Sequence, residues 1–259
     1  MSGNKRGLIL QERDRRLFEE LAVMRIVDRD QAMRVAGSQS VTRANSRLLA
    51  LTRARFLRRF FLGTVGGARK ALYALSQKSA ELTHVPYRGP RRPSDQTLAT
   101  DFFVTHQLHI NEIHCRLKFE PIPILGASFI RWVAFHEPVV KGSSLIPDGY
   151  AEVTTPQKNL AFFLEVDLGN ESRAVWRKKV DAYLQYAVSG AFPERFLHGM
   201  QFRTLVAADS ERRMQSLRVA TAEVTQKIFW FTTLDAIAKD GLWSPIWLRP
   251  VGDVRQTLL

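Results

Sequence analysis

Residues 145–167 have the sequence LIPDGYAEVTTPQKNLAFFLEVD, in which two β-prone runs surround a polar turn. The runs at 145–153 and 160–167 have the length and apolar content of paired strands. Side chains on a strand alternate between its two faces, so Glu165 and Asp167 are expected on the same side. The segment therefore predicts a hairpin with two carboxylates on one face of an otherwise apolar strand.

The residues around this hairpin extend the pattern into an α/β (α+β) domain. The expected elements are a helix at 94–117, strands at 128–135, 145–153 and 160–167, a helix at 171–187, a strand at 202–207, a helix at 210–224 and a strand at 227–232. Helices that alternate with strands in this order predict a central mixed sheet.

The first third of the chain has a different pattern. Helical spacing of apolar residues predicts helices at 11–25, at 29–35 between Asp28 and Gly37, and from Ser40 or Thr42 to about residue 54. Two β-prone runs, 56–62 and 69–75, then surround Gly66-Gly67, which predicts a β-hairpin. Three helices followed by a hairpin are the layout of a winged helix-turn-helix.

Residues 83–95 separate the two patterns. They contain Pro86, Pro90 and Pro93 together with Gly89 and three arginines. Prolines at this density interrupt helices and strands. We therefore expect a winged helix over residues 1–82, a Pro/Arg-rich linker over 83–95 and the α/β domain over 96–259.

The net charge of +13 is concentrated in the winged-helix region. Residues 1–95 contain 20 Lys or Arg and 8 Asp or Glu, whereas residues 96–259 contain 18 and 17. Such a block indicates a polyanionic partner, and arginine forks suit phosphates and guanine edges. Residues 41–70 have no acid, and their basic residues are the predicted contacts to double-stranded DNA: Arg43, Arg47, Arg53, Arg55, Arg58, Arg59, Arg69 and Lys70. A winged helix used for protein contact stays open as an alternative.

Other features of the composition exclude several classes of protein. The single cysteine, Cys115, excludes a disulfide framework and a cysteine-rich zinc module, and its neighbours predict a buried helix position. No apolar run reaches the ~18 residues of a membrane span. The first residues lack the apolar stretch of a signal peptide. We expect a soluble cytoplasmic protein without a membrane partner.

Asp148, Glu165 and Asp167 are the candidate catalytic residues and metal ligands. Carboxylates on a buried face are costly unless something neutralises them. A divalent cation would do so, and hard oxygen ligands suit Mg²⁺ (or Mn²⁺). Asp148 can join the other two if the first strand of the hairpin pairs alongside the second.

Pro147-Asp148 followed by Glu165-Val166-Asp167 resembles the motifs of the PD-(D/E)XK nuclease superfamily. The resemblance implies a restriction-endonuclease-like fold in which the acids hold one or two metal ions, the metal polarises the scissile phosphate and a lysine helps to activate water. Here Asp167 stands in place of the lysine of the second motif, as an acid does in some restriction enzymes. Lys179, on the same side of the next helix as Trp176 and Tyr183, is the candidate for that catalytic role.

A wider set of segments, spread over roughly residues 10–235, resembles the replication-relaxation family of plasmids and mobile elements. They are Gly67-Ala68-Arg69…Leu72-Tyr73-Ala74-Leu75, Ile146-Pro147-Asp148-Gly149, Phe163-Leu164-Glu165-Val166-Asp167 and Trp176…Lys179…Tyr183. The family includes mobilisation relaxases with a nuclease-like core and members described only as DNA-binding.

This resemblance implies an enzyme, a Mg²⁺-dependent DNA endonuclease or nickase that a winged helix targets to DNA. The alternative is a non-catalytic DNA-binding regulator of replication, transfer or transcription that keeps a degenerate nuclease fold. A homodimer and contacts with other replication or transfer proteins of the mobile element stay open.

Tyr150, close to Asp148, is expected to form a wall of the candidate site.

Overall fold

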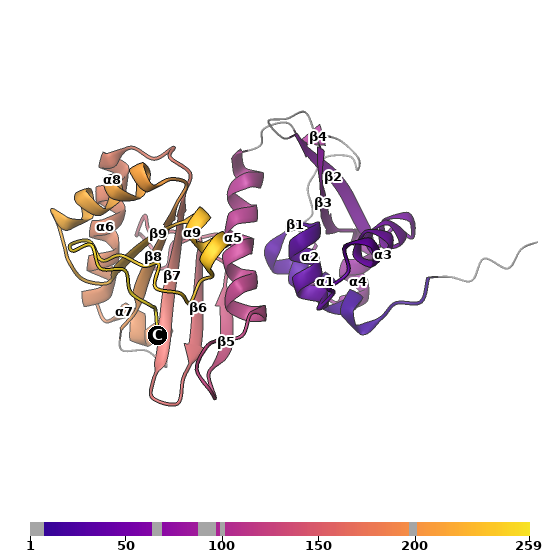
Figure 1. Ribbon diagram of the computed structural model, residues 1–259, viewed down its shortest axis with the longest axis horizontal. Coiled ribbons are helices and arrows are strands. Elements are labelled where there is room, and N and C mark those ends of the chain that lie inside the picture. Colours follow the sequence, from indigo (N-terminus) through magenta and orange to yellow (C-terminus); the bar gives the residue numbers. More distant parts are fainter. Residues whose placement is uncertain (1–7, 64–68, 88–96, 99–101, 197–200) are drawn as a thin grey trace, which may run out of the picture. The chain divides into compact units, whose positions relative to one another are not determined.

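The computed structural model describes residues 8–63, 69–87, 97–98, 102–196 and 201–259. Contacts within the chain divide it into two compact units, Met1–Cys115 and Arg116–Leu259 (Figure 1). Both units combine helices with a β-sheet, which confirms the predicted α+β class. None of the described helices is long and apolar enough to cross a membrane.

The N-terminal unit begins with three helices, α1 (Glu12–Met24), α2 (Arg29–Ala36) and α3 (Val41–Arg53). The Asp28 side chain caps α2 by accepting from the Gln31 N–H, and α2 ends at Gly37, whose φ of 63° suits glycine. The Ser40 hydroxyl caps α3 by accepting from the Arg43 N–H. The three predicted helices and their caps are therefore confirmed.

A four-stranded sheet in the order β1-β3-β2-β4 completes this unit. Its strands are β1 (Ile26–Asp28), β2 (Leu57–Gly63), β3 (Arg69–Leu75) and β4 (Thr97–Leu98). Strands β2 and β3 pair antiparallel from Leu57 opposite Leu75 to Gly63 opposite Arg69, as predicted for the hairpin arms. The turn with Gly66-Gly67 lies outside the described residues.

The segment after the hairpin differs from the prediction. A short helix, α4 (Gln77–Thr83), directly follows β3 and contains the first residue of the expected linker. Thr97 and Leu98, expected in a helix, instead pair in parallel with Phe61 and Leu62 as β4. This pairing satisfies backbone groups at the edge of β2, and that gain outweighs the local helical pattern. The helix itself, α5 (Phe102–Phe119), begins later than expected.

Hydrogen bonds tie most of α5 to the N-terminal unit. The Gln31 amide donates to the Leu108 carbonyl at 2.7 Å. The Asn111 amide donates to the carbonyls of Met24 and Ile26, at 3.0 and 2.6 Å. Cys115 is fully buried, as predicted. The N-terminal unit thus extends to Cys115 and includes residues that the sequence analysis assigned to the second domain.

The C-terminal unit has a five-stranded mixed sheet in the order β5-β6-β7-β8-β9. Its strands are β5 (Ser128–Val133), β6 (Gly149–Thr154), β7 (Asn159–Asp167), β8 (Arg203–Ala208) and β9 (Phe229–Thr233). The first three strands are antiparallel, whereas β7, β8 and β9 are parallel to one another. All five strands lie close to their predicted positions.

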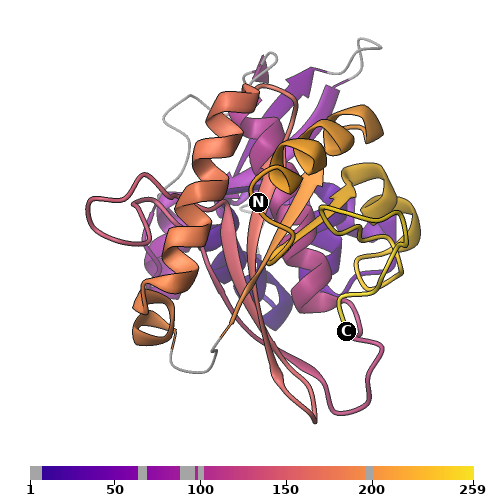
Figure 2. The same cartoon turned by 90° about the vertical axis from the view of Figure 1, so that its left-hand side faces the viewer.

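The helices of this unit are α6 (Arg173–Val188), α7 (Ala191–Arg195), α8 (Glu211–Ala222) and α9 (Leu234–Asp240). Figures 1 and 2 show α6 and α8 together on one face of the sheet. A buried aromatic cluster that includes Phe163, Trp176 and Tyr183 fills the space between this face and the helices. In β7, Ala161 and Phe163 belong to this cluster and Glu165 bonds to α6, so these three side chains point toward the helices.

Candidate nucleic-acid interface and carboxylate site

Helix α3 has one buried and one exposed face. Ala44, Leu48 and Leu51 are buried, because their helical spacing turns them toward the core of the unit. The opposite side is polar and exposed, with Thr42, Arg43, Asn45, Ser46 and Arg53. A helix anchored on its apolar side presents this polar face to the surroundings.

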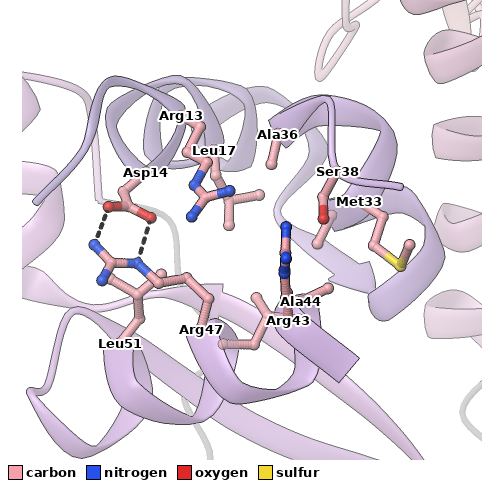
Figure 3. A pocket seen from close by; sticks show the side chains of 12 residues that line it. Arg13, Asp14, Leu17, Met33, Ala36, Ser38, Arg43, Ala44, Arg47 and Leu51 are labelled. Carbon is pink, nitrogen blue, oxygen red and sulfur yellow. Dashed lines mark hydrogen bonds and ion pairs between the residues drawn. The ribbon is translucent and has the colours of Figure 1, made fainter. Parts of the chain in front are cut away.

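Arg47, which the sequence predicted as a DNA contact, is held inside the unit. Its Nε lies 3.0 Å from Oδ1 of the buried Asp14, and its Nη2 contacts Oδ2 of the same carboxylate (Figure 3). The hydrogen bond to Asp14 raises the pKa of Arg47. The Ile9 carbonyl accepts a further bond at 2.8 Å. Arg47 therefore joins α3 to α1.

The other predicted DNA contacts fall into two groups. Arg58 and Arg59 stack over the rings of Phe60 and Phe61, each 5.0 Å from the ring centre, and Lys70 pairs with Asp28. The second group consists of the exposed residues Arg43, Arg53, Arg55 and Arg69, none of which has an ion pair with any residue that the structure describes. These four arginines are the ones whose guanidinium groups are available to a ligand.

Thr42, Asn45 and Ser46 were missed by the sequence analysis, which selected residues by charge. They lie at i, i+3 and i+4 on the exposed face of α3. The signal that could have found them is their offset from Ala44 and Leu48 along the same helix. An exposed Asn side chain can form paired hydrogen bonds with adenine.

The carboxylate site of the C-terminal unit lies where β6 begins and β7 ends. Asp148 directly precedes β6, and its Oδ2 accepts from the Val166 N–H at 2.7 Å. The Asp148 N–H donates to the Leu164 carbonyl at 3.0 Å. The first strand of the hairpin thus pairs alongside the second and brings Asp148 next to Glu165, as the sequence analysis required.

Glu165 is almost fully buried, with 2% of its surface exposed, and has two partners on α6. Lys179 Nζ lies 2.9 Å from Oε2, and the Tyr183 hydroxyl donates to Oε1 at 2.6 Å. Burial raises the pKa of Glu165 to about 7, Lys179 opposes this shift and Asp148 adds to it. Although burial lowers the pKa of Lys179, the carboxylates of Glu165 and Glu171 raise it further than burial lowers it. The 2.9 Å distance between Lys179 Nζ and Glu165 Oε2 indicates an ion pair.

Asp167 is bound by an arginine from α8. Arg213 Nε lies 2.6 Å from Oδ1 and its Nη2 lies 2.7 Å from Oδ2, so both carboxylate oxygens are engaged. The Gly169 N–H donates to Oδ1 at 2.8 Å. The hydrogen bond to Asp167 raises the pKa of Arg213. A two-point arginine–carboxylate pair of this kind is among the stronger interactions of a protein.

These contacts decide how a metal ion would fit. Arg213 uses both oxygens of Asp167, so this residue does not fit the role of a metal ligand. In the part of the chain that the structure describes, no three Asp, Glu, His or Cys side chains are grouped to hold a metal. Asp148 and Glu165 remain as a pair of adjacent carboxylates, beside Lys179. The three predicted carboxylates therefore do not form one cluster. Glu165 pairs with Lys179 on α6, whereas Asp167 pairs with Arg213 on α8.

Tyr150 lies apart from this site, in the aromatic core. Its ring centre is 4.9 Å from that of Phe163, and its hydroxyl donates to Glu152 at 2.6 Å. Arg131 Nη2 lies 2.5 Å from the same Glu152 oxygen. Tyr150 is therefore packed in the aromatic core and bonds to the buried Glu152, which pairs with Arg131 of β5, rather than lining a site at Asp148.

A known protein family matches most of the chain. The family model described as replication-relaxation matches residues 18–218, which include α3, the hairpin and the carboxylate residues. No curated protein and no solved structure matches the chain significantly.

Proposed function

Because the chain belongs to the replication-relaxation family, we propose that it binds double-stranded DNA during the replication or transfer of a plasmid or mobile element. The observation that carries this proposal is the exposed face of α3. It combines arginines without ion pairs to the described residues with uncharged hydrogen-bonding side chains. A surface of this composition suits both phosphates and base edges.

The order of elements supports a winged-helix mode of binding. Helices α1, α2 and α3 are followed by the antiparallel strands β2 and β3, so α3 takes the position of a recognition helix and the hairpin that of a wing. In this mode α3 enters the major groove, where Asn45 and Arg53 meet base edges. Arg69, at the start of β3, binds the phosphate backbone.

Removal of Arg53 and Arg69 tests this mode. We expect Arg53→Ala with Arg69→Ala to weaken the binding of a mixed-sequence duplex about tenfold, because a base contact and a phosphate contact are lost, and to lower the slope of log K against log salt by about 1, because only Arg69 neutralises a phosphate. Fluorescence anisotropy of the full chain over a salt series measures both.

The matched control is Lys178→Ala with Arg212→Ala, which removes two exposed charges from α6 and α8. This variant should retain the affinity and the slope of the unaltered protein. Equal losses in the two double variants would mean that net charge alone governs binding, and the proposed interface would be wrong.

For the C-terminal unit, the ion pairs favour a non-catalytic role. Lys179 and Arg213 neutralise Glu165 and Asp167 without a metal, so the carboxylates are compensated within the fold. In this proposal the unit is a scaffold that presents the DNA-binding unit to other proteins of the mobile element, or to a second copy of the chain.

Metal-dependent DNA cleavage is the second candidate function, and one observation favours it. Asp148, Glu165 and Lys179, two acids and a lysine, converge at one end of β7. Asp148 and Glu165 would hold Mg²⁺ or Mn²⁺, and the metal would polarise a phosphate group. Lys179 would then leave Glu165 and keep its bond to Glu171.

A nicking assay separates the two roles. If the site is catalytic, the protein converts supercoiled plasmid to relaxed circles with Mg²⁺ or Mn²⁺, EDTA stops the reaction, and Glu165→Gln abolishes it while DNA affinity is retained. The scaffold role predicts no metal-dependent nicking by either protein. Equal nicking by both would identify a contaminating nuclease.

A further inference from the structure

A small pocket, with about 30 Å³ of space open to water-sized molecules, lies between α1, α2 and α3 (Figure 3). Its apolar wall includes Leu17, Ala32, Ala44 and Leu48. Arg13 reaches into the pocket from α1, whereas Arg43 approaches it from the first turn of α3. Two cationic side chains thus face one small space with an apolar wall.

The charges around this pocket are not balanced. Arg13, Arg43, Arg47 and Asp14 are the charged residues of the described lining, which gives an excess of two positive charges. Arg47 already engages both oxygens of Asp14. The buried Nε of Arg13 has no hydrogen-bond partner among the described residues, and Arg43 has no ion pair with them. A buried donor without a partner is unfavourable, and an anion beside the same guanidinium group would offset part of this cost through its charge.

The beginning of α3 adds to the positive potential. Arg43 and Ala44 belong to its first turn, and this turn contains no acidic residue. The N-terminus of a helix of this length carries a partial positive charge that favours anions. The guanidinium group is planar and matches two oxygens of a phosphate.

We propose that this pocket binds a phosphate-sized oxyanion between Arg13 and Arg43. The anion comes either from a DNA phosphodiester or from free phosphate. In the first case the inference rests on the proposed DNA binding, and in the second it is independent of it. Bound there, the anion bridges α1 to the first turn of α3 and fixes the recognition helix.

The first experiment uses inorganic phosphate as the probe, at constant ionic strength, and records the thermal unfolding of the full chain. We expect a saturable rise in melting temperature of about 2–5 °C that is lost in Arg13→Gln and in Arg43→Gln. Arg16→Gln, an exposed arginine on α1, is the matched control and should keep the rise. A general salting effect of phosphate would act alike on all four proteins and would not saturate.

The second experiment distinguishes the two sources of the anion. If the DNA backbone fills the pocket, Arg13→Gln lowers the slope of log K against log salt by about 1, whereas Arg16→Gln does not. An unchanged slope together with the saturable rise supports free phosphate.

The proposal is overturned if Arg13→Gln and Arg16→Gln behave alike in both experiments. It is also overturned if acetate, and not phosphate, produces the Arg13-dependent rise, because the pocket would then suit a partner's carboxylate. The Arg53 and Arg69 variants report on DNA binding separately. If those variants lose DNA affinity while Arg13→Gln changes neither the melting temperature nor the salt slope, the proposed anion site is wrong and the proposed DNA binding stands.

Discussion

At the scale of single residues, Arg43 and Arg47 show why charge alone is a poor guide to function. They are four positions apart on α3, and both were predicted to contact DNA. Arg47 is bound to a buried carboxylate, whereas Arg43 is exposed. Both side chains line the space between α1, α2 and α3, but only Arg47 lies opposite Asp14 (Figure 3).

This difference leads to a prediction about stability. We expect Arg47→Ala to lower the free energy of unfolding of the N-terminal unit by about 3 kcal/mol, because it leaves Asp14 buried without its ion-pair partner. Arg43→Ala should change this free energy by less than about 0.5 kcal/mol, as is usual for an exposed side chain. Urea denaturation of the full chain, followed by circular dichroism, measures both. Equal losses would show that Arg47 does not stabilise the fold.

In the C-terminal unit too, the positions of the carboxylate residues were predictable, whereas one of their partners was not. That Glu165 and Asp167 share a face follows from strand alternation, and Lys179 was singled out by its place on the next helix. The partner of Asp167 could not be foreseen, because Arg213 lies 46 residues further along the chain. Likewise, 33 residues separate Arg47 from Asp14. Pairs of this kind depend on how elements pack, and no local pattern encodes them.

At the scale of elements, long segments with a clear period were predictable and short ones were not. Helices α1, α3 and α6 and strand β7 combine an apolar period with recognisable ends. Strands β1 and β4 have three and two residues, and helices α7 and α9 have five and seven, which is too few to show a period. Strand β4 exists only because β2 has an edge to pair with.

The contact between β7 and α8 yields a prediction at this scale. Arg213, near the start of α8, binds Asp167 at the end of β7, so Arg213→Gln should loosen α8 from the sheet. We expect amide exchange in residues 211–222 to become faster, and the free energy of unfolding to fall by about 3 kcal/mol.

Arg212→Gln is the control for this experiment, because its side chain is exposed one residue away. It should leave the exchange of α8 unchanged. If Arg213→Gln and Arg212→Gln gave the same exchange rates, the contact between Arg213 and Asp167 would not hold α8 against the sheet. The Asp167 carboxylate would then be available to a metal ion.

At the scale of the whole molecule, the two units differ in how their charged residues are arranged. The basic block of the sequence falls on the unit that contains α3 and the hairpin, where Arg43, Arg53, Arg55 and Arg69 are exposed and have no ion pair with the described residues. In the C-terminal unit, the buried acids Glu152, Glu165 and Asp167 are paired with Arg131, Lys179 and Arg213. One unit carries an excess of positive charge, whereas the buried acids of the other are neutralised within that unit.

The proposed function requires that DNA contacts α3 and the hairpin. Hydrogen–deuterium exchange of the full chain, with and without a saturating mixed-sequence duplex, tests it most directly. We expect DNA to slow the exchange of amides in residues 41–75 and to leave the exchange in residues 149–167 and 203–233 unchanged. Slower exchange confined to residues 116–259, with no change in α3, would contradict it.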